Sequence, residues 1–244
     1  MQQTTLTVAE NVRLTSDTYR LVLTGDTSAI TAPGQFVDLK LAGFYLRRPI
    51  SVCDWEEGRV TLIYKVLGHD TEAMTALPVG TALDVLTGLG NGYDAAKSGE
   101  KPLLVGGGVG IPPLYGLCKR LVAQGKSVTA VLGFNRAEDI FLADEFRALG
   151  AQVIIATADG SAGLRGLVTD GMAAAPDYTY LYTCGPEAML KAVYGACRTS
   201  GQFSFEERMG CGFGACMGCS CQTKYGSKRI CKDGPVLEKE EIVW

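Results

Sequence analysis

Four cysteines near the end of the chain have a spacing that can hold an inorganic cluster. Cys211, Cys216, Cys219 and Cys231 follow the pattern C-x4-C-x2-C-x11-C. Three cysteines in one loop with a fourth further along are typical of plant-type [2Fe–2S] sites. Glycines between the first three allow positive φ angles and let backbone N–H groups approach the sulfurs. The segment therefore predicts a centre that carries single electrons.

Other uses of these cysteines are weaker alternatives. Structural zinc sites more often pair short C-x2-4-C knuckles, and disulfides need an oxidising compartment that nothing in the sequence indicates. Cys221 follows Cys219 by two residues, and the spacing favours Cys219 as the third ligand. A single histidine, His69, argues against a Rieske centre, which needs two.

A glycine-rich turn, Gly106-Gly107-Gly108-Val109-Gly110, lies between an apolar segment and a helical pattern. Such a turn lets the backbone and a helix N-terminus approach a pyrophosphate. It is not the G-x-G-x-x-G fingerprint, because Ile111 stands where the last glycine should be. A tight turn alone is the alternative. Cys184-Gly185-Pro186 follows a later apolar segment and is another candidate for the ligand-binding edge of a sheet, or simply a turn with a buried cysteine.

Residues 1–98 are predicted to form a small antiparallel β-barrel, because short segments of alternating polarity are separated by Gly and Pro. Expected strands lie at residues 4–14, 18–23, 36–41, 49–53 and 59–67. One of them carries Arg48-Pro49-Ile50-Ser51, where the guanidinium could pair with a phosphate and the hydroxyl with a heterocycle. A strand with an ordinary surface arginine is the alternative.

Residues 99–205 are predicted to form a doubly wound parallel α/β domain, because strands and helices alternate. Strands are expected at 103–105, 128–132, 153–156, 178–182 and 203–205, and helices at 111–124, 137–149, 164–174 and 186–199. Residues 206–244 would form a small cluster-binding module with a hairpin-like stretch at 223–230. This segment is too short to bury much core, so the cluster would staple it.

Composition narrows the class of protein. The chain has 244 residues, 47% of them hydrophobic and 20% charged, with a net charge of −3. These values suit a globular protein and make nucleic acid an unexpected partner. The N-terminal stretch lacks the basic and apolar regions of a signal peptide, and no apolar run is long enough to span a membrane. Nine cysteines without an export signal lead us to expect a cytoplasmic protein.

The order of the motifs resembles the ferredoxin–NADP reductase superfamily: Arg48–Ser51, then Gly68-x-x-Thr71, then the glycine-rich turn, then Cys184–Pro186. The cysteine loop narrows the resemblance. Glu206-Glu207-Arg208-Met209 before it and Cys231-x-Asp-Gly-Pro235 after it are similar to the electron-transfer subunits of type B dihydroorotate dehydrogenases. The resemblance covers essentially the whole chain.

This resemblance implies FAD in the barrel domain and NAD in the α/β domain. The residues expected at the flavin and its phosphates are Arg48, Pro49, Ile50, Ser51, Ile63, Tyr64, Lys65, Asp70 and Thr71. Those expected at the nicotinamide nucleotide are Gly106, Gly107, Gly108, Gly110, Cys184, Gly185 and Pro186. The chain departs from the family at Gly68-His69-Asp70-Thr71, where Gly-x-Gly-Thr is usual, and a carboxylate beside phosphates costs energy.

The residues themselves leave NAD and NADP open. Arg136 follows the second expected strand and could pair with a 2′-phosphate, whereas Glu138 and Asp139 come directly after it.

The resemblance also implies a partner and an electron path. An FMN-containing catalytic subunit would oxidise dihydroorotate to orotate in pyrimidine (UMP) biosynthesis, in a heterotetramer of two catalytic and two electron-transfer subunits. Electrons would pass singly to a cluster held by Cys211, Cys216, Cys219 and Cys231, and then to FAD, which reduces NAD⁺. No residue of this chain need act as an acid–base catalyst.

Two other functions remain to be separated from this one. A related flavin and iron–sulfur NAD(P)H-oxidoreductase subunit of another cytoplasmic complex, of the sulfide dehydrogenase, transhydrogenase or hydrogenase type, would share the barrel, the nucleotide domain and a similar cluster. The Glu-Glu-Arg-Met stretch favours the dihydroorotate system. A non-catalytic adaptor stapled by zinc would be colourless and would contain no flavin.

Overall fold

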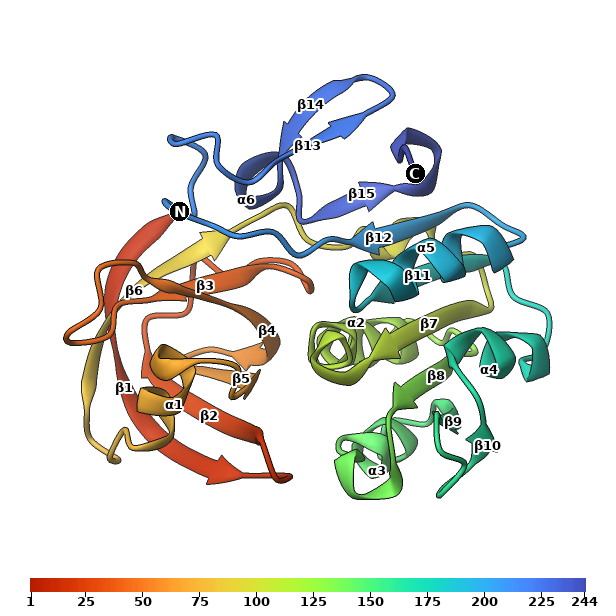
Figure 1. Cartoon of the computed structure of the whole chain (residues 1–244), viewed down its shortest axis with the longest axis horizontal. Coiled ribbons are helices and arrows are strands. Elements are labelled where there is room, and N and C mark those ends of the chain that lie inside the picture. The colour runs from red at the N-terminus through yellow and green to blue at the C-terminus, as the bar shows by residue number, and fades with distance from the viewer.

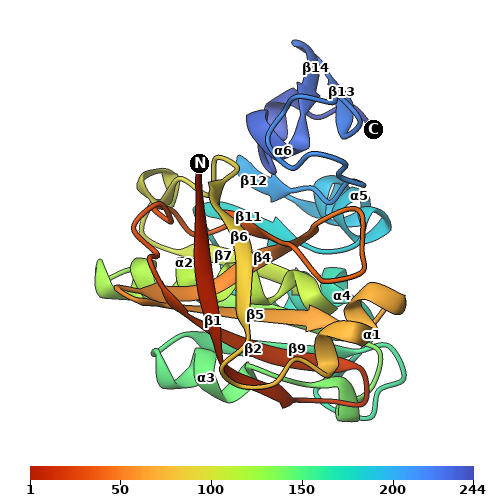
Figure 2. The same cartoon turned by 90° about the vertical axis from the view of Figure 1, so that its left-hand side faces the viewer.

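In a computed structural model that describes residues 1–244, the first six strands close into an antiparallel barrel with the order β1-β2-β5-β4-β3-β6 (Figures 1 and 2). They are β1 (Gln2–Arg13), β2 (Thr18–Gly25), β3 (Phe36–Leu39), β4 (Arg48–Glu56), β5 (Arg59–Lys65) and β6 (Ala82–Leu89). Alternation drives closure: Val60, Leu62 and Tyr64 of β5 face the barrel core, and the residues between them face outward. The predicted barrel is confirmed.

The sequence predicts that residues 1–98 are all-β, but in the structure this domain also contains helical segments. Helix α1 (His69–Thr75) follows β5, and a 3₁₀ turn (Ala95–Lys97) follows β6. The hydroxyl of Thr71 accepts hydrogen bonds from the backbone N–H groups of Leu67 and Gly68, which fixes the start of α1. Met74 is buried in the barrel core. The helix has only two turns, too few for a periodic pattern.

The second domain is built on a sheet of seven strands with the order β10-β9-β8-β7-β11-β12-β15. They are β7 (Pro102–Gly107), β8 (Thr129–Phe134), β9 (Gln152–Thr157), β10 (Leu164–Arg165), β11 (Tyr180–Cys184), β12 (Gly201–Ser204) and β15 (Val236–Glu238). All pairings are parallel except that of β15 with β12. The chain order reverses between β7 and β11, which is the usual ligand position in such sheets. The predicted doubly wound domain is confirmed.

Helices cover this sheet: α2 (Pro112–Ala123), α3 (Ala143–Ala148), α4 (Val168–Ala174) and α5 (Glu187–Ala196). The single helix expected at 137–149 is wrong. A 3₁₀ turn (Ala137–Asp139) and α3 replace it, separated by Leu142 in the left-handed region at φ 62°. The helix expected at 164–174 begins instead as the short strand β10, and only α4 is helical.

The C-terminal segment lies across both domains (Figure 1). It contains the hairpin β13 (Ser220–Thr223) and β14 (Gly226–Arg229), the short helix α6 (Ile230–Asp233), β15 and a 3₁₀ turn (Lys239–Glu241). Asn91, in the connection after β6, exchanges side-chain hydrogen bonds with the backbone of Val236 at 2.7 and 3.1 Å. The segment is therefore tied to the link between the domains.

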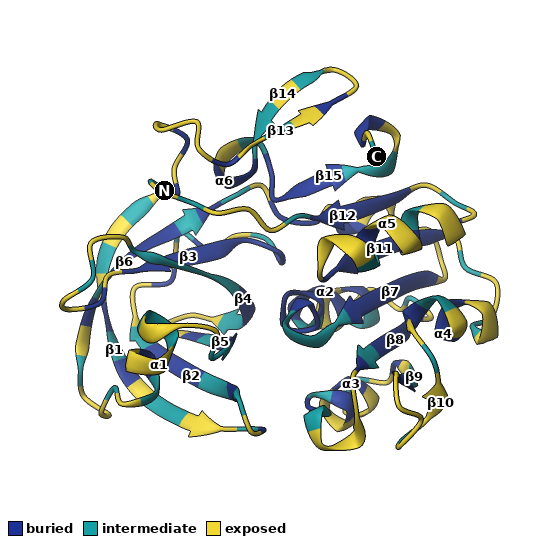
Figure 3. Cartoon of the chain, viewed as in Figure 1, coloured by how far each residue is buried: buried dark blue, intermediate teal, exposed yellow.

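The two domains share a buried interface. Gly116 of α2 lies against β4, and a Cβ atom there would come within 3.0 Å of the Cys53 carbonyl oxygen. Cys53 and Ile63 of the barrel are buried among apolar residues of α2, which include Leu117. In Figure 3 helix α2 is largely buried, whereas β4 opposite it is mostly of intermediate burial. No helix is long and apolar enough to cross a membrane.

Candidate functional site

The four candidate cluster ligands lie in the loop before β13 and in α6. Cys219 and Cys231 are both buried, with 2% of their surface exposed, whereas Cys211 is half-buried and Cys216 is exposed. The Cys231 backbone N–H donates to the Cys219 sulfur at 3.4 Å, which joins the loop to α6. One side of the group therefore faces the protein interior and the other faces the surface.

Backbone N–H groups of the loop point at the sulfurs. Those of Ala215 and Cys216 donate to Cys211 at 3.2 and 3.4 Å, and that of Gly218 donates to Cys216 at 3.5 Å. Burial acts to raise the pKa of Cys211, but these N–H donors outweigh it and lower that pKa to about 6. A thiolate that accepts backbone hydrogen bonds is the form that binds iron.

The donor set fits a [2Fe–2S] cluster. Positive φ angles at Gly212 (75°) and Gly214 (92°) turn the loop so that its N–H groups converge. A [2Fe–2S] cluster is bonded by two thiolates at each of its two irons, and four cysteine thiols supply that number.

Strand β3 of the barrel lies directly under the cysteine loop. Asp38 of β3 is 2% exposed, and a Cβ atom at Gly212 would collide with its carboxylate. Burial raises the pKa of Asp38 to about 6 in spite of the opposing charges of Arg47 and Arg48. Asp38 pairs in register with Pro49 of β4, so the loop abuts the strand pair on which the flavin residues were expected.

The two motifs expected at the nicotinamide nucleotide come together at the switch point. Strands β7 and β11 are neighbours, and Gly106 pairs in register with Cys184. Gly110 packs against the Cys184 carbonyl so closely that a Cβ atom would not fit. Burial raises the pKa of the Cys184 thiol. Cys184 is 2% exposed, so its side chain is held inside while the backbone of the turn borders the ligand position.

A cleft of about 560 Å³ opens between the two domains at this point. Its barrel wall includes Asp17, Lys65 and Leu67. The wall on the other domain includes Gly107, Gly108, Gly110, Pro186 and Met189. The expected nucleotide residues therefore border one cavity with an expected flavin residue, and the volume and glycine-lined wall suit a nucleotide.

The residues that follow β8 help to determine whether the site binds NAD or NADP. Asn135 and Asp139 line the cleft. Arg136 forms ion pairs with Glu138 at 2.7 Å and with Asp139 at 3.5 Å. The Arg136 guanidinium is thus paired with carboxylates, and the acidic side chain of Asp139 borders the cleft. This arrangement favours a ribose 2′-hydroxyl over a 2′-phosphate.

The stretch expected at the flavin lies on β4 and β5. Arg48, Pro49, Ile50 and Ser51 are all half-buried, so a ligand can reach them. On β5 the side chains of Ile63 and Tyr64 are buried, the first in the interface between the domains and the second in the barrel core. Lys65 reaches the cleft and pairs with Asp17 at 3.0 Å.

The departure from the family sequence at Asp70 has a direct structural partner. Asp70 forms an ion pair with Arg48 through Oδ2, and its Oδ1 accepts a hydrogen bond from the Thr71 backbone N–H at 2.9 Å. The His69 side chain is 99% exposed, and its Nδ1 lies 3.8 Å from Oε2 of Glu72. The three residues expected at the FAD phosphates, Arg48, Asp70 and Thr71, therefore lie together.

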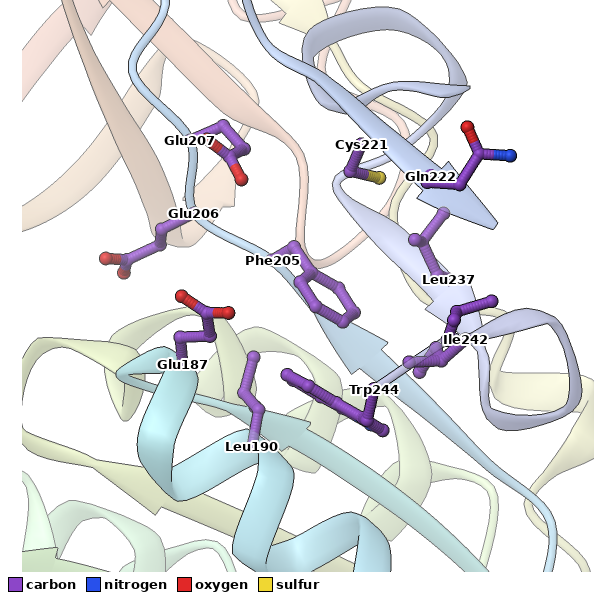
Figure 4. Close-up of a pocket in the computed structure, with 11 residues that line it drawn as sticks. Glu187, Leu190, Phe205, Glu206, Glu207, Cys221, Gln222, Leu237, Ile242 and Trp244 are labelled. Carbon is purple, nitrogen blue, oxygen red and sulfur yellow. The ribbon is translucent and has the colours of Figure 1, made fainter. Parts of the chain in front are cut away.

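A second cavity of about 240 Å³ lies between α5 and the C-terminal segment (Figure 4). Phe205 and Trp244 stack across it with ring centres 5.6 Å apart. Cys221 lines this cavity and makes no hydrogen bond with a candidate ligand sulfur. Glu206 borders both cavities, and desolvation raises the pKa of its carboxyl.

Sequence reasoning did not identify Asp38, Asp17 or Met189 as parts of these sites. Asp38 looks like an outward polar residue in an alternating strand, whereas in the structure it is buried and the distant cysteine loop contacts its carboxylate. Met189 packs against Gly107 and Gly185 and carries no local signal. Each of these roles depends on contacts between segments far apart in the chain.

Two family models match the chain. Residues 206–243 match the iron-sulfur cluster binding domain of dihydroorotate dehydrogenase B, and residues 104–195 match the oxidoreductase NAD-binding domain. The first range contains all four candidate cluster ligands, and the second contains the glycine-rich turn and Cys184.

Curated relatives match over the full length. The chain is 45% identical to the dihydroorotate dehydrogenase B (NAD(+)) electron transfer subunit of Shouchella clausii, covering 99% of this chain and 98% of the relative. It is 43% identical to the subunit of the same name from Geobacillus sp., covering 100% and 99%.

Solved structures agree on the fold. An NADH-dependent reduced ferredoxin-NADP oxidoreductase chain, described for flavin-based electron bifurcation, is 30% identical, with a TM-score of 0.89 over 98% of this chain and 90% of that one. The cytochrome P450 reductase GcoB of Amycolatopsis is 22% identical, with a TM-score of 0.71 over 80% and 65%, and shows the fold alone.

Proposed function

The chain belongs to the family of electron transfer subunits of dihydroorotate dehydrogenase B, and we propose that it carries electrons from a dihydroorotate-oxidising catalytic subunit to NAD⁺ through a [2Fe–2S] cluster and FAD. It is a subunit of an NAD-linked oxidoreductase. The observation that carries the proposal is the group of three thiols in the cysteine loop and the Cys231 thiol of α6, with backbone N–H donors at the sulfurs and with Gly212 of the loop packed against the barrel.

Each part of the chain has a defined task in this function. Cys211, Cys216, Cys219 and Cys231 hold the cluster, and the loop N–H groups stabilise the negative charge on the sulfurs. The exposed side of the loop, at Cys216, faces the electron donor, and the buried side faces the barrel.

The cleft between the domains holds the nicotinamide nucleotide, and the flavin lies beside it on β4 and β5, from which Lys65 reaches the cleft. Arg48 to Ser51, Ile63 to Lys65, Asp70 and Thr71 border the flavin and its phosphates, the buried residues of β5 through their backbone. Gly106, Gly107, Gly108, Gly110, Cys184, Gly185 and Pro186 orient NAD⁺ at the switch point. FAD, when bound, exchanges electrons one at a time with the cluster and in pairs with the nucleotide.

The partner follows from the family. We propose that this chain assembles in the cytoplasm with an FMN-containing catalytic subunit as a heterotetramer of two subunits of each kind, in the pathway that makes UMP. Phe213 and Met217, both exposed in the cysteine loop, flank Cys216 and offer apolar surface to such a subunit.

The first experiment is an anaerobic visible spectrum of the purified chain with iron, zinc and flavin quantified, before and after addition of NADH. Flavin bands and a broad [2Fe–2S] absorption that NADH bleaches support the proposal. A colourless protein that contains zinc overturns it.

The partner is tested by mixing the chain, with its cofactors bound and oxidised and with no NADH present, with the purified catalytic subunit. Dihydroorotate-dependent reduction of NAD⁺, in a complex of equal subunit numbers, is the expected result. A protein that has both cofactors but couples only to a different electron donor would identify it as a subunit of another complex.

A further inference from the structure

The Asp70 carboxylate contacts two groups, the Arg48 guanidinium and the Thr71 backbone N–H, that could otherwise donate hydrogen bonds to a phosphate. One of its oxygens pairs with the Arg48 guanidinium, and the other accepts a hydrogen bond from the Thr71 backbone N–H at 2.9 Å. Guanidinium groups and backbone N–H groups commonly bind phosphate oxygens. The carboxylate therefore takes up donors that suit an anionic ligand.

The Thr71 side chain is also engaged within the chain. Its hydroxyl accepts from Leu67 and Gly68 at 2.9 and 3.1 Å and donates to the Gly68 carbonyl oxygen at 3.0 Å. Arg48 further donates to the Leu46 and Arg47 carbonyl oxygens at 3.2 and 2.9 Å. Arg48 and Thr71 therefore each contact neighbouring backbone as well as the Asp70 carboxylate.

We propose that Asp70 is an internal competitor for the FAD pyrophosphate, so that flavin binding requires the Arg48 guanidinium to be released from Asp70 or shared with it. This inference rests on the proposed function, because it takes FAD as the ligand of this site. Its consequence is weaker flavin binding than the same barrel would have with a neutral residue at position 70.

The physical basis is the repulsion between two negatively charged groups, the Asp70 carboxylate and the FAD pyrophosphate. The side chains of Arg48 and Asp70 are 24% and 20% exposed, so solvent only partly screens the repulsion between the carboxylate and a phosphate. Removing the negative charge while keeping the hydrogen-bond acceptor should tighten FAD binding by about tenfold.

The test is the FAD dissociation constant of deflavinated protein, measured by the change in flavin fluorescence. Asp70→Asn keeps an acceptor for the Thr71 N–H and removes the charge, and Asp70→Gly removes both. Both variants should bind FAD about tenfold more tightly than the wild type, and the gain should shrink in high salt. Glu72→Gln is the matched control, because Glu72 carries the same charge in the same helix and pairs only with the exposed His69.

A double-mutant cycle with Arg48→Gln identifies the contact that is responsible. Arg48→Gln should weaken FAD binding, and Asp70→Asn should give little gain in that background. Equal or weaker FAD binding by both Asp70 variants overturns the inference while leaving the proposed function intact. A wild-type chain that binds no FAD at all overturns the proposed function itself.

Discussion

The carboxylate of Asp38 in β3 lies directly against the backbone of Gly212 in the cysteine loop, with no room for a side chain between them. Gly212 also has a φ angle of 75°, which favours glycine. The barrel strand and the loop are therefore in contact at the residue that follows the first candidate ligand. Asp38 pairs in register with Pro49 of β4, the strand expected at the flavin, so β3 lies between the cysteine loop and that strand.

Gly212→Ala should lower the iron content of the purified protein, because the new methyl group would push the loop away from Asp38. Gly43→Ala is the matched control: Gly43 has a φ of 84° but no atoms within 4 Å of an added Cβ. Both variants should lose about 1–2 kcal/mol of stability from the backbone conformation. Equal iron content in the two variants would contradict the importance of the contact.

Cys219→Ser should remove the cluster, since Cys219 is buried beside Cys231. NADH-dependent reduction of a dye by the flavin should persist, whereas dihydroorotate-dependent NAD⁺ reduction should fall by at least about 100-fold. Cys221→Ser is the control and should keep both the iron and the coupled activity. Full coupled turnover in Cys219→Ser would disprove the electron path.

Replacing two carboxylates beside Arg136 should increase the use of NADPH. Glu138→Gln combined with Asp139→Asn frees the Arg136 guanidinium and removes an acid from the cleft. The kcat/KM for NADPH should rise by about tenfold, with a smaller change for NADH. Asp144→Asn, which removes an exposed carboxylate paired with Arg147, is the control. An unchanged ratio of kcat/KM for NADPH to that for NADH would mean that the 2′-position of the adenine ribose does not lie beside Arg136.

Glu238 should contribute stability that disappears in acid. It accepts hydrogen bonds from Lys97, Gln202 and Tyr180 at 2.7 to 2.8 Å. Burial acts against ionisation, but these donors lower the pKa of Glu238 below its ordinary value of 4.5. A depressed pKa stabilises the fold above that ordinary value, and the contribution is lost as the pH falls through the lower value of the folded state.

Urea unfolding of Glu238→Gln measures this contribution. The variant should be less stable than the wild type by about 1–2 kcal/mol near neutral pH, and the difference should narrow below about pH 4.5. Exposed Glu240, changed to Gln, is the control under the same conditions. A difference that stays constant with pH would exclude ionisation of Glu238 as its source.

Local patterns were sufficient for the architecture. Alternation in β5 and the sequence of apolar strands and helices after residue 99 predict the barrel and the doubly wound sheet, because each pattern depends only on neighbours in the chain. The break at Leu142 was not predictable in this way. Residues 137–149 are good helix formers, but Phe141 turns inward to pack edge-to-face on Phe134.

The site residues likewise fall into those that lie in one stretch of sequence and those that only the fold brings together. Motifs that occur in one stretch, such as the cysteine loop and the glycine-rich turn, could be found by reading along the chain. The ion pair of Arg48 with Asp70 and the burial of Asp38 could not, because each joins segments that only the folded barrel brings together.

The pairing of β15 with β12 has a consequence for how the protein behaves when iron is scarce. β15 is the only strand beside β12 on that side of the sheet, and it follows the last candidate ligand, Cys231, by five residues. A chain without its cluster would hold β15 less firmly and expose the N–H and C=O groups of β12. Open strand edges recruit strands from other molecules. Loss of iron would then promote self-association, and the metal would protect solubility as well as conduct electrons.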